Sequence, residues 1–248
     1  MRMTRSVVVA VLCLAAAAAA QTAEELVAKN LAARGGVDKI KSIDTLKMSG
    51  TVFLEFAGGG INALFSQENK RPNMIRQGFT LQGMTQTEAY DGSAGWKISP
   101  FEGRKDPELI GEDETRELVD DSEIDGPLVD YQAKGNKVEY LGHDIVDGDD
   151  AYKLKVTLKN GDVVYYYLDP DTYLEIKTVL EMFIRGSVRE TEQLLGSYKQ
   201  VNGVYYPHSV VVNTKGGSGP AHMRFSFDTI KANMPIEDAF FKMPAAAK

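Results

Sequence analysis

The chain has 248 residues, of which 35 are acidic and 28 are basic, and its formal net charge at pH 7 is −7. Nucleic acids and anionic lipid surfaces attract proteins through basic faces, so this balance disfavours both kinds of partner. The single cysteine, Cys13, lies in a segment that we expect to be removed. Its loss excludes a disulfide framework, a thiolate nucleophile and cysteine metal ligands.

Residues 1–20 have the pattern of a secretory signal peptide. Two arginines precede an apolar run over 6–14, and a series of alanines then leads to an expected cleavage between Ala20 and Gln21. Residues 21–248 are therefore predicted to form a single exported domain, which is not an integral membrane protein.

A retained anchor and a lipid-modified Cys13 are less favoured readings of the same segment. The apolar run is shorter than the roughly 20 residues that span a bilayer. Leu12 occupies the position at which a lipoprotein signal needs a small residue.

The first element of the mature chain is predicted to be a helix. Thr22 and Glu25 have the spacing of a capping box, and Gly35–Gly36 would end the helix. A short helical turn is expected over 37–43. From residue 45 the apolar residues recur with a period of two, which indicates a half-buried strand.

Most of the remaining chain is predicted to be antiparallel strands. Glycines over 58–60 and 216–217 are expected turns. Alternation and turn residues predict further strands from about 61 and over about 73–81, 84–90, 94–99, 152–159, 163–168, 174–182, 187–198, 205–213 and 221–228.

One segment interrupts the strands. Residues 102–130 contain twelve acidic and three basic residues, and we interpret them as helices that cross the sheet, with a break at Gly126–Pro127 and a solvated charged face. A long sheet curls. The pattern therefore predicts a mainly β, α+β fold in which one curved sheet wraps around helices.

No catalytic or cofactor-binding constellation stands out. His143, His208 and His222 are not at metal-ligand spacing, and the chain has neither a nucleophile-elbow motif nor a phosphate-binding loop. The acidic run 147–150 lacks the ligand spacing of a calcium loop and is better explained as a hairpin tip. We therefore expect no enzymatic activity, no cofactor and no metal site.

Apolar side chains are the remaining candidates for a functional surface. Methionine suits a wall that must adapt to different apolar shapes. Whether these residues fill the interior or surround a cavity is left open by the sequence. The candidates for a lipid-binding lining are Met48, Leu54, Phe56, Phe65, Met74, Phe79, Met84, Trp96, Tyr165, Tyr167, Leu174 and Met182.

Several short motifs resemble the periplasmic carriers of outer-membrane lipoproteins, the LolA-like family. They are Lys70–Met74 (Lys-Arg-Pro-Asn-Met), Met84–Gln86, the turn Asp91–Gly92, Trp96 and Pro100–Phe101. The match covers about thirty residues well and most of the mature chain loosely. The long acidic insertion and Ser99, where the family often has Asn, depart from the pattern.

The resemblance implies a half-open antiparallel β-barrel with helices covering its concave side and an apolar cavity for acyl chains. It also implies that Arg71 is a lid latch, which hydrogen-bonds lid backbone. Our leading hypothesis is a periplasmic carrier of an acylated lipoprotein or lipid, served by inner- or outer-membrane release and acceptor proteins. The alternatives are an envelope sensory or regulatory module that binds a protein partner, and an exported hydrolase with histidines brought together by the fold.

Overall fold

The computed structural model describes residues 21–56, 59–184, 186–216 and 221–245. The predicted signal peptide lies outside these ranges, and the two predicted glycine turns lie partly outside them. In the described part of the chain, no helix has the length and apolar character needed to cross a membrane.

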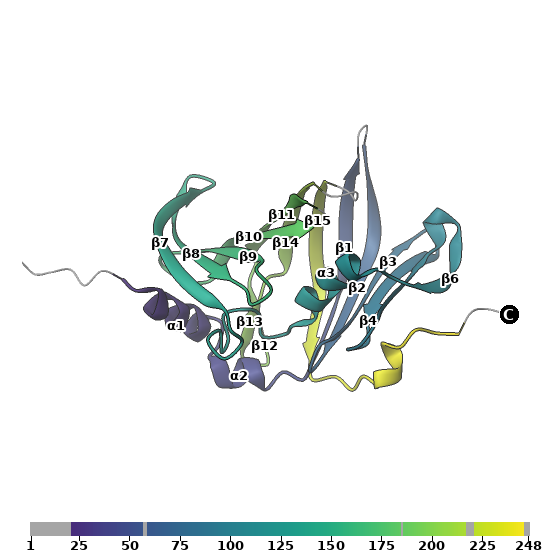
Figure 1. The fold of residues 1–248 in the computed structure, drawn as a ribbon, viewed down its shortest axis with the longest axis horizontal. Coiled ribbons are helices and arrows are strands. Elements are labelled where there is room, and N and C mark those ends of the chain that lie inside the picture. Colours follow the sequence, from purple (N-terminus) through teal and green to yellow (C-terminus); the bar gives the residue numbers. More distant parts are fainter. Residues whose placement is uncertain (1–20, 57–58, 185, 217–220, 246–248) are drawn as a thin grey trace, which may run out of the picture.

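One antiparallel sheet of thirteen strands dominates the molecule (Figure 1). It curves without closing, which confirms the predicted mainly β fold and the half-open barrel. Its strands, in spatial order, are β6 (Arg104–Leu109), β5 (Gly95–Ser99), β4 (Met84–Tyr90), β3 (Met74–Leu81), β2 (Gly59–Lys70), β1 (Thr45–Phe56), β15 (His222–Ala232), β14 (Ser209–Lys215), β11 (Ser187–Gly196), β10 (Glu175–Ile184), β9 (Val163–Leu168), β8 (Asp149–Thr157) and β7 (Lys137–Val146).

The first and last strands of the domain join the two halves of the sheet. β1 pairs antiparallel with β15, and the register shifts between Ser49 and Gly50. A Cβ atom on Gly50 would lie 1.9 Å from the carbonyl oxygen of Ser226, so only glycine allows this close approach. A β-bulge bends a strand, and this one lies where the sheet turns from one half to the other.

The edge strands β6 and β7 do not pair with each other. The chain between them crosses the concave side as α3 (Glu112–Ser122) and an irregular segment over 123–136 (Figure 1). The expected helices of the acidic segment are thus a single helix, preceded by a 3₁₀ turn (Pro100–Glu102) and the edge strand β6. We call α3 and 123–136 the lid.

The main core lies inside the C-terminal half of the sheet. α1 (Ala23–Ala33) begins with the predicted capping box, and α2 (Val37–Lys41) follows it. Their apolar residues pack with those of the lid and of strands β8 and β9, because each of these elements has one apolar side to bury. The buried side chains include Leu26, Ile40, Ile43, Leu128, Val129, Leu154 and Leu168.

A C-terminal segment covers the outer face of the N-terminal half. It runs over 233–245 and includes a 3₁₀ turn (Asp238–Phe240). The indole nitrogen of Trp96 donates a hydrogen bond to the carbonyl oxygen of Phe241 at 2.7 Å, and both side chains are fully buried. A small hairpin of β12 (Lys199–Val201) and β13 (Val204–Tyr206) completes the fold.

Candidate functional site

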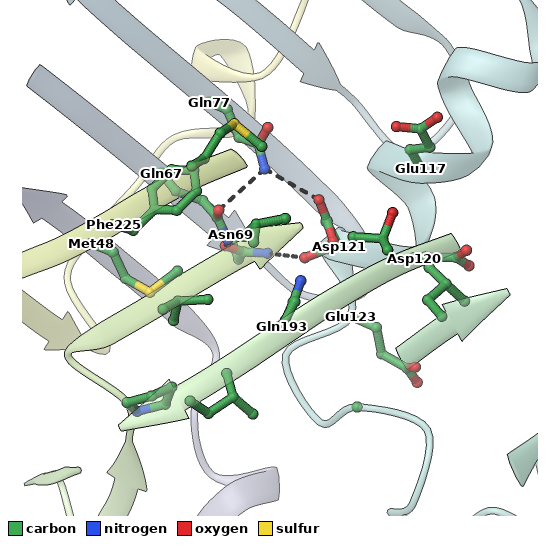
Figure 2. Close-up of a pocket in the computed structure, with 18 of the residues that line it drawn as sticks. Met48, Gln67, Asn69, Gln77, Glu117, Asp120, Asp121, Glu123, Gln193 and Phe225 are labelled. Carbon is green, nitrogen blue, oxygen red and sulfur yellow. Dashed lines mark hydrogen bonds between the residues drawn. The ribbon is translucent and has the colours of Figure 1, made fainter. Parts of the chain in front are cut away.

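A cavity of about 500 Å³ lies between the concave face and the lid (Figure 2). This volume is within the range of ligand-binding pockets, roughly 300–1,000 Å³. Strands from both halves of the sheet contribute to it, so the cavity depends on the β1–β15 connection. Its walls include Met48, Phe65, Gln67, Asn69, Gln77, Phe79, Leu180, Met182, Thr191, Gln193, Val210, Val212, Met223, Phe225 and Phe227.

One end of the cavity is aromatic. The ring of Phe65 lies 5.1 Å from that of Phe79, 4.9 Å from that of Phe225 and 5.9 Å from that of Phe227. Side chains alternate between the two faces of a strand, so the register of β1, β2, β3 and β15 places these rings on one side of the sheet. They provide an apolar surface with no hydrogen-bonding groups.

The other end is lined by amides. Gln77 Nε2 donates to Gln67 Oε1 at 3.2 Å, and Gln67 Nε2 donates to Asn69 Oδ1 at 2.8 Å. Asn69 Nδ2 in turn donates to the backbone carbonyl oxygen of Asp121, at the end of α3, at 2.8 Å (Figure 2). The amides thus attach the sheet to the lid and satisfy one another.

Helix α3 is fixed to the sheet by ion pairs on both sides. Glu114 pairs with Lys97 of β5, Glu117 pairs with Arg189 of β11, and Arg116 binds both carboxylate oxygens of Asp162. A Cβ atom at position 95 of β5 would lie 2.7 Å from the side chain of Thr115, so a glycine there lets the helix pack close to the sheet.

Two carboxyl groups of α3 have strongly raised pKa values. Burial raises the pKa of Asp120 to about 6, and the charge of Asp162 adds to the effect. Burial raises the pKa of Asp121 to about 7, with the charge of Asp120 as the second cause. Asp121 is an exposed residue that lines the cavity, and its carboxylate accepts a hydrogen bond from Gln77 Nε2 at 3.4 Å, which acts to lower its pKa. Perturbed carboxyl groups in a cleft are typical of functional sites.

Some polar atoms at this end are unsatisfied. Among the described residues, Asp120 Oδ2 and Arg189 Nε are buried and have no hydrogen-bond partner. A buried acceptor or donor without a partner costs about 1–3 kcal/mol. Asn30 Oδ1 in α1 and the Tyr206 hydroxyl are unpartnered as well, so such atoms are not confined to this end of the cavity.

A second cavity, of about 420 Å³, lies beside the first. Asp120, Asp121, Glu123, Leu180, Thr191 and Gln193 line both cavities. Beyond these shared residues, the second cavity is bordered by polar side chains that include Lys134, Asn136 and Asn160. Its lining also includes the apolar side chains of Leu158, Val164 and Tyr166, so Asp120 and Asp121 lie where two cavities of mixed lining meet.

Arg71 joins β2 to the lid. Its Nη1 and Nη2 atoms bind the two carboxylate oxygens of Asp125 at 2.8 and 2.5 Å. Nε donates to the carbonyl oxygen of Ile43 at 2.7 Å, and Nη2 donates to that of Ile40 at 3.1 Å. Burial acts to raise the pKa of Asp125, but the hydrogen bonds and charge of Arg71 hold it below the ordinary aspartate value. The latch function of Arg71 stays a prediction.

Met48, Phe65, Phe79 and Met182, from the predicted lining, border the cavity. Leu54 packs against the cluster around Phe65. Whether these side chains bind lipid stays a prediction.

Four of the predicted lining residues lie on the outer face and do not border this cavity. Met74 and Trp96 lie on the side that the C-terminal segment covers, since Arg76, two residues after Met74, stacks on the Trp96 ring. Tyr165 and Tyr167 alternate with inward-facing neighbours and contact Lys153. Alternation along a strand identifies two faces but does not tell which one is concave, so these four residues are placed on the other face from the cavity lining.

Three other predicted residues are also outside the cavity lining. Phe56 and Met84 are 46% and 42% exposed at strand ends, and Leu174 lies in the turn before β10. The sequence analysis missed the amides and the α3 carboxylates. The signal available was Gln67 and Asn69, which are polar on the same face of β2 as Phe65.

The histidines do not converge on either cavity. His143 contacts Asp150 at 2.6 Å, His222 contacts Asn213 at 2.6 Å, and His208 lies beside the carbonyl oxygen of Tyr206. Within the described ranges, no group of three or more His, Cys, Asp or Glu residues is arranged to hold a metal ion.

No protein-family model and no curated protein sequence matches the chain. Solved structures do match its fold. A DUF1329 family protein from Desulfovibrio piger is 12% identical, with a TM-score of 0.62 over 89% of this chain and 97% of that one. A LolA superfamily protein from Nitrosomonas europaea is 11% identical, with a TM-score of 0.58 over 90% and 98%. A domain assigned to outer membrane lipoprotein sorting, from Vibrio parahaemolyticus, is 14% identical, with a TM-score of 0.57 over 88% and 94%. The chain thus has the LolA-like fold.

The raised pKa values predict how stability depends on pH. Asp120 and Asp121 have folded pKa values of about 6 and about 7, above the ordinary value of 3.8, so the native state keeps protons that the unfolded chain releases. These groups make the free energy of unfolding increase as the pH falls from about 7 to about 4. The folded pKa of Asp125 is lowered below 3.8, so its contribution to the free energy of unfolding is lost only when the pH falls below that window.

Urea unfolding at a series of pH values checks this dependence. Asp121→Asn should flatten the profile, because it removes the group with the higher pKa. Glu112→Gln, an exposed change in the first turn of the same helix, should leave the profile as it is. A wild-type slope in the Asp121→Asn variant would contradict the assignment.

Proposed function

We propose that this protein is a periplasmic carrier that binds the acyl chains of a lipoprotein or lipid in the cavity beneath the lid. The observation that carries the proposal is the aromatic end of the cavity, where four phenylalanine rings line a space that the lid shelters. The LolA-like fold and the predicted signal peptide support an envelope location.

Apolar burial alone suffices for this activity. Each methylene that leaves water contributes about 0.8 kcal/mol, so a long acyl chain is held without covalent chemistry. The carrier needs no catalytic group. Release needs a competing acceptor or a change in the lid.

The lid contacts supply a means of control. Arg71 connects the end of β2 with Asp125 in the lid and with backbone carbonyls beside α2. Opening the lid would break the bonds between Arg71 and Asp125, whereas the bonds to Ile40 and Ile43 would still hold Arg71 to the α2 region. Hydrogen bonds to charged groups contribute about 1.5–3 kcal/mol each, which is enough to adjust retention of a ligand but not to reverse the apolar driving force.

The alternative function is an envelope sensory or regulatory module that binds a protein partner. The observation in its favour is an exposed apolar pair on the outer face of the β10–β11 hairpin. Phe183 and Val188 lie opposite each other and are 65% and 59% exposed. Partner binding there would not depend on the cavity.

Filling the cavity tests the carrier proposal. Thr191 lines the cavity from β11, so Thr191→Trp should occupy the space that an acyl chain needs. We expect the affinity for fluorescently labelled palmitate to fall about tenfold or more, which corresponds to roughly 1.4 kcal/mol. Val188→Trp, on the outer face of the same strand, should leave the affinity unchanged. Equal binding by both variants, or no binding by the wild type, would refute the proposal.

Arg71→Leu tests the latch. The substitution removes the bonds to the lid and leaves Asp125 without its cation, so we expect labelled palmitate to dissociate about tenfold faster in a stopped-flow displacement experiment. Lys70→Leu is the matched control, because the adjacent Lys70 binds the C-terminal segment through Asp238 and the Ile236 carbonyl oxygen. Dissociation at the wild-type rate in a folded Arg71→Leu protein would rule out the latch.

A further inference from the structure

The concave face of the β10–β11 hairpin carries three uncharged polar side chains beside the cavities. Thr178 of β10 lies directly opposite Gln193 of β11, and Thr191 lies two residues before Gln193, on the same face of its strand. Thr191 and Gln193 line both cavities, and Thr178 lines the second one. We call these three residues the β10–β11 polar group.

The side chains of this group have no partner within the described part of the chain. None of the three forms a hydrogen bond or an ion pair there, and their polar atoms are not among the buried unpartnered ones. They are therefore accessible from the cavities, and Figure 2 shows Gln193 on the side of the cavity where Asp121 lies. The amides of the facing wall differ, because Gln67, Asn69 and Gln77 bond to one another.

An apolar chain alone would leave the β10–β11 polar group unsatisfied. A glutamine amide offers two donors and an acceptor oxygen, and each threonine hydroxyl can donate or accept. A hydrocarbon that displaced water from these atoms would leave them unpaired, which is unfavourable. In ligand pockets that are mainly apolar, a few polar groups fix the orientation of the ligand. The group therefore suits a ligand that carries a hydrogen-bond acceptor beside its chain.

The register of the sheet places this group close to the phenylalanine rings. Gln193 lies opposite Val212 of β14, and Val212 lies opposite Met223 of β15, two residues before Phe225. Neighbouring strands are about 4.8 Å apart, so β15 is roughly 10 Å from the Gln193 backbone. Val212, Met223 and Phe225 all line the first cavity. A chain that lies against the rings can thus have its polar end at Gln193.

We propose that Gln193, Thr191 and Thr178 form a hydrogen-bonding subsite, which holds the carbonyl oxygen of an acyl ester or an acyl amide. The acyl chain of this ligand lies against the phenylalanine rings. The inference rests on the proposed carrier function and adds the class of ligand. Glycerolipids supply the carbonyl as an ester, and acylated amines supply it as an amide.

A free carboxylate fits this subsite less well than a neutral carbonyl group. The two arginines that line the first cavity already face carboxylates, because Arg189 is paired with Glu117 and Arg34 with Glu175. Glu123 borders both cavities, and like charges brought together in a desolvated site are unfavourable. A neutral acceptor avoids this repulsion and still satisfies the donors of the subsite.

Three probes with the same chain length test the proposal by isothermal titration of the intact mature protein. They are 1-monododecanoylglycerol, which is an ester, 1-O-dodecylglycerol, in which an ether replaces the ester, and N-methyldodecanamide, which is an amide. We expect the ester to bind about fivefold more tightly than the ether, because only the ester has a carbonyl oxygen for the subsite.

Substitutions in the subsite locate the source of this preference. Gln193→Leu removes the hydrogen-bonding atoms and keeps a similar side-chain length, so the ester and the amide should each bind about fivefold more weakly. Thr191→Val removes one hydroxyl and should reduce the preference for the ester about twofold. Gln200→Leu is the matched control, because Gln200 is exposed in β12 and borders neither cavity. It should keep the full preference.

The outcomes separate the subsite from the carrier function. Circular dichroism establishes which variants are folded, and Thr191→Val carries the test alone if Gln193→Leu is not. A preference that the folded subsite variants retain, or that Gln200→Leu loses to the same extent, would overturn the subsite. Equal binding of ester and ether by the wild type would overturn the subsite alone, whereas no binding of any probe would overturn the carrier function as well.

The ester and the amide distinguish the two sources of the carbonyl. Weaker binding of both probes to Gln193→Leu supports the subsite as proposed. A loss confined to the ester supports it and assigns it to a glycerolipid, and a loss confined to the amide supports it and assigns it to an acylated amine.

Discussion

The sheet curves but does not close, and this constraint determines the rest of the structure. Because β6 and β7 are separate edges, the chain that connects them must cross the concave side. It does so as an acidic helix and a loop, anchored by ion pairs to Lys97, Arg189 and Asp162 and by Arg71 at the end of β2. The chain that connects the two edges thus covers the open concave face. It leaves a space beneath the lid, and that space is the candidate site.

Some polar side chains that line this space lower the stability of the folded protein. Most buried polar atoms in native proteins have a hydrogen-bond partner, yet Asp120 Oδ2 and Arg189 Nε have none among the described residues. The pKa values of Asp120 and Asp121 are raised because the native state disfavours their charged forms. Proteins commonly accept such costs where function requires them.

The sequence was sufficient for the fold class but not for the site. The capping box at Thr22 and the alternation along the strands depend on local chemistry, so they were predicted correctly. Alternation identifies two faces of a strand but not which one is concave, and here the C-terminal segment buries Trp96 on the outer face. The cavity depends on β1 meeting β15, about 180 residues later, and on the place where α3 crosses the sheet. No local pattern encodes either contact.

The central claim is that the lidded cavity holds a non-covalent amphiphile. Native mass spectrometry of the mature protein, isolated from a cell envelope without detergent, tests it most directly. The account predicts a bound species of lipid mass that is lost under denaturing conditions, and that Thr191→Trp fails to retain. Protein of ligand-free mass, which also takes up no acyl probe when one is added, would contradict it.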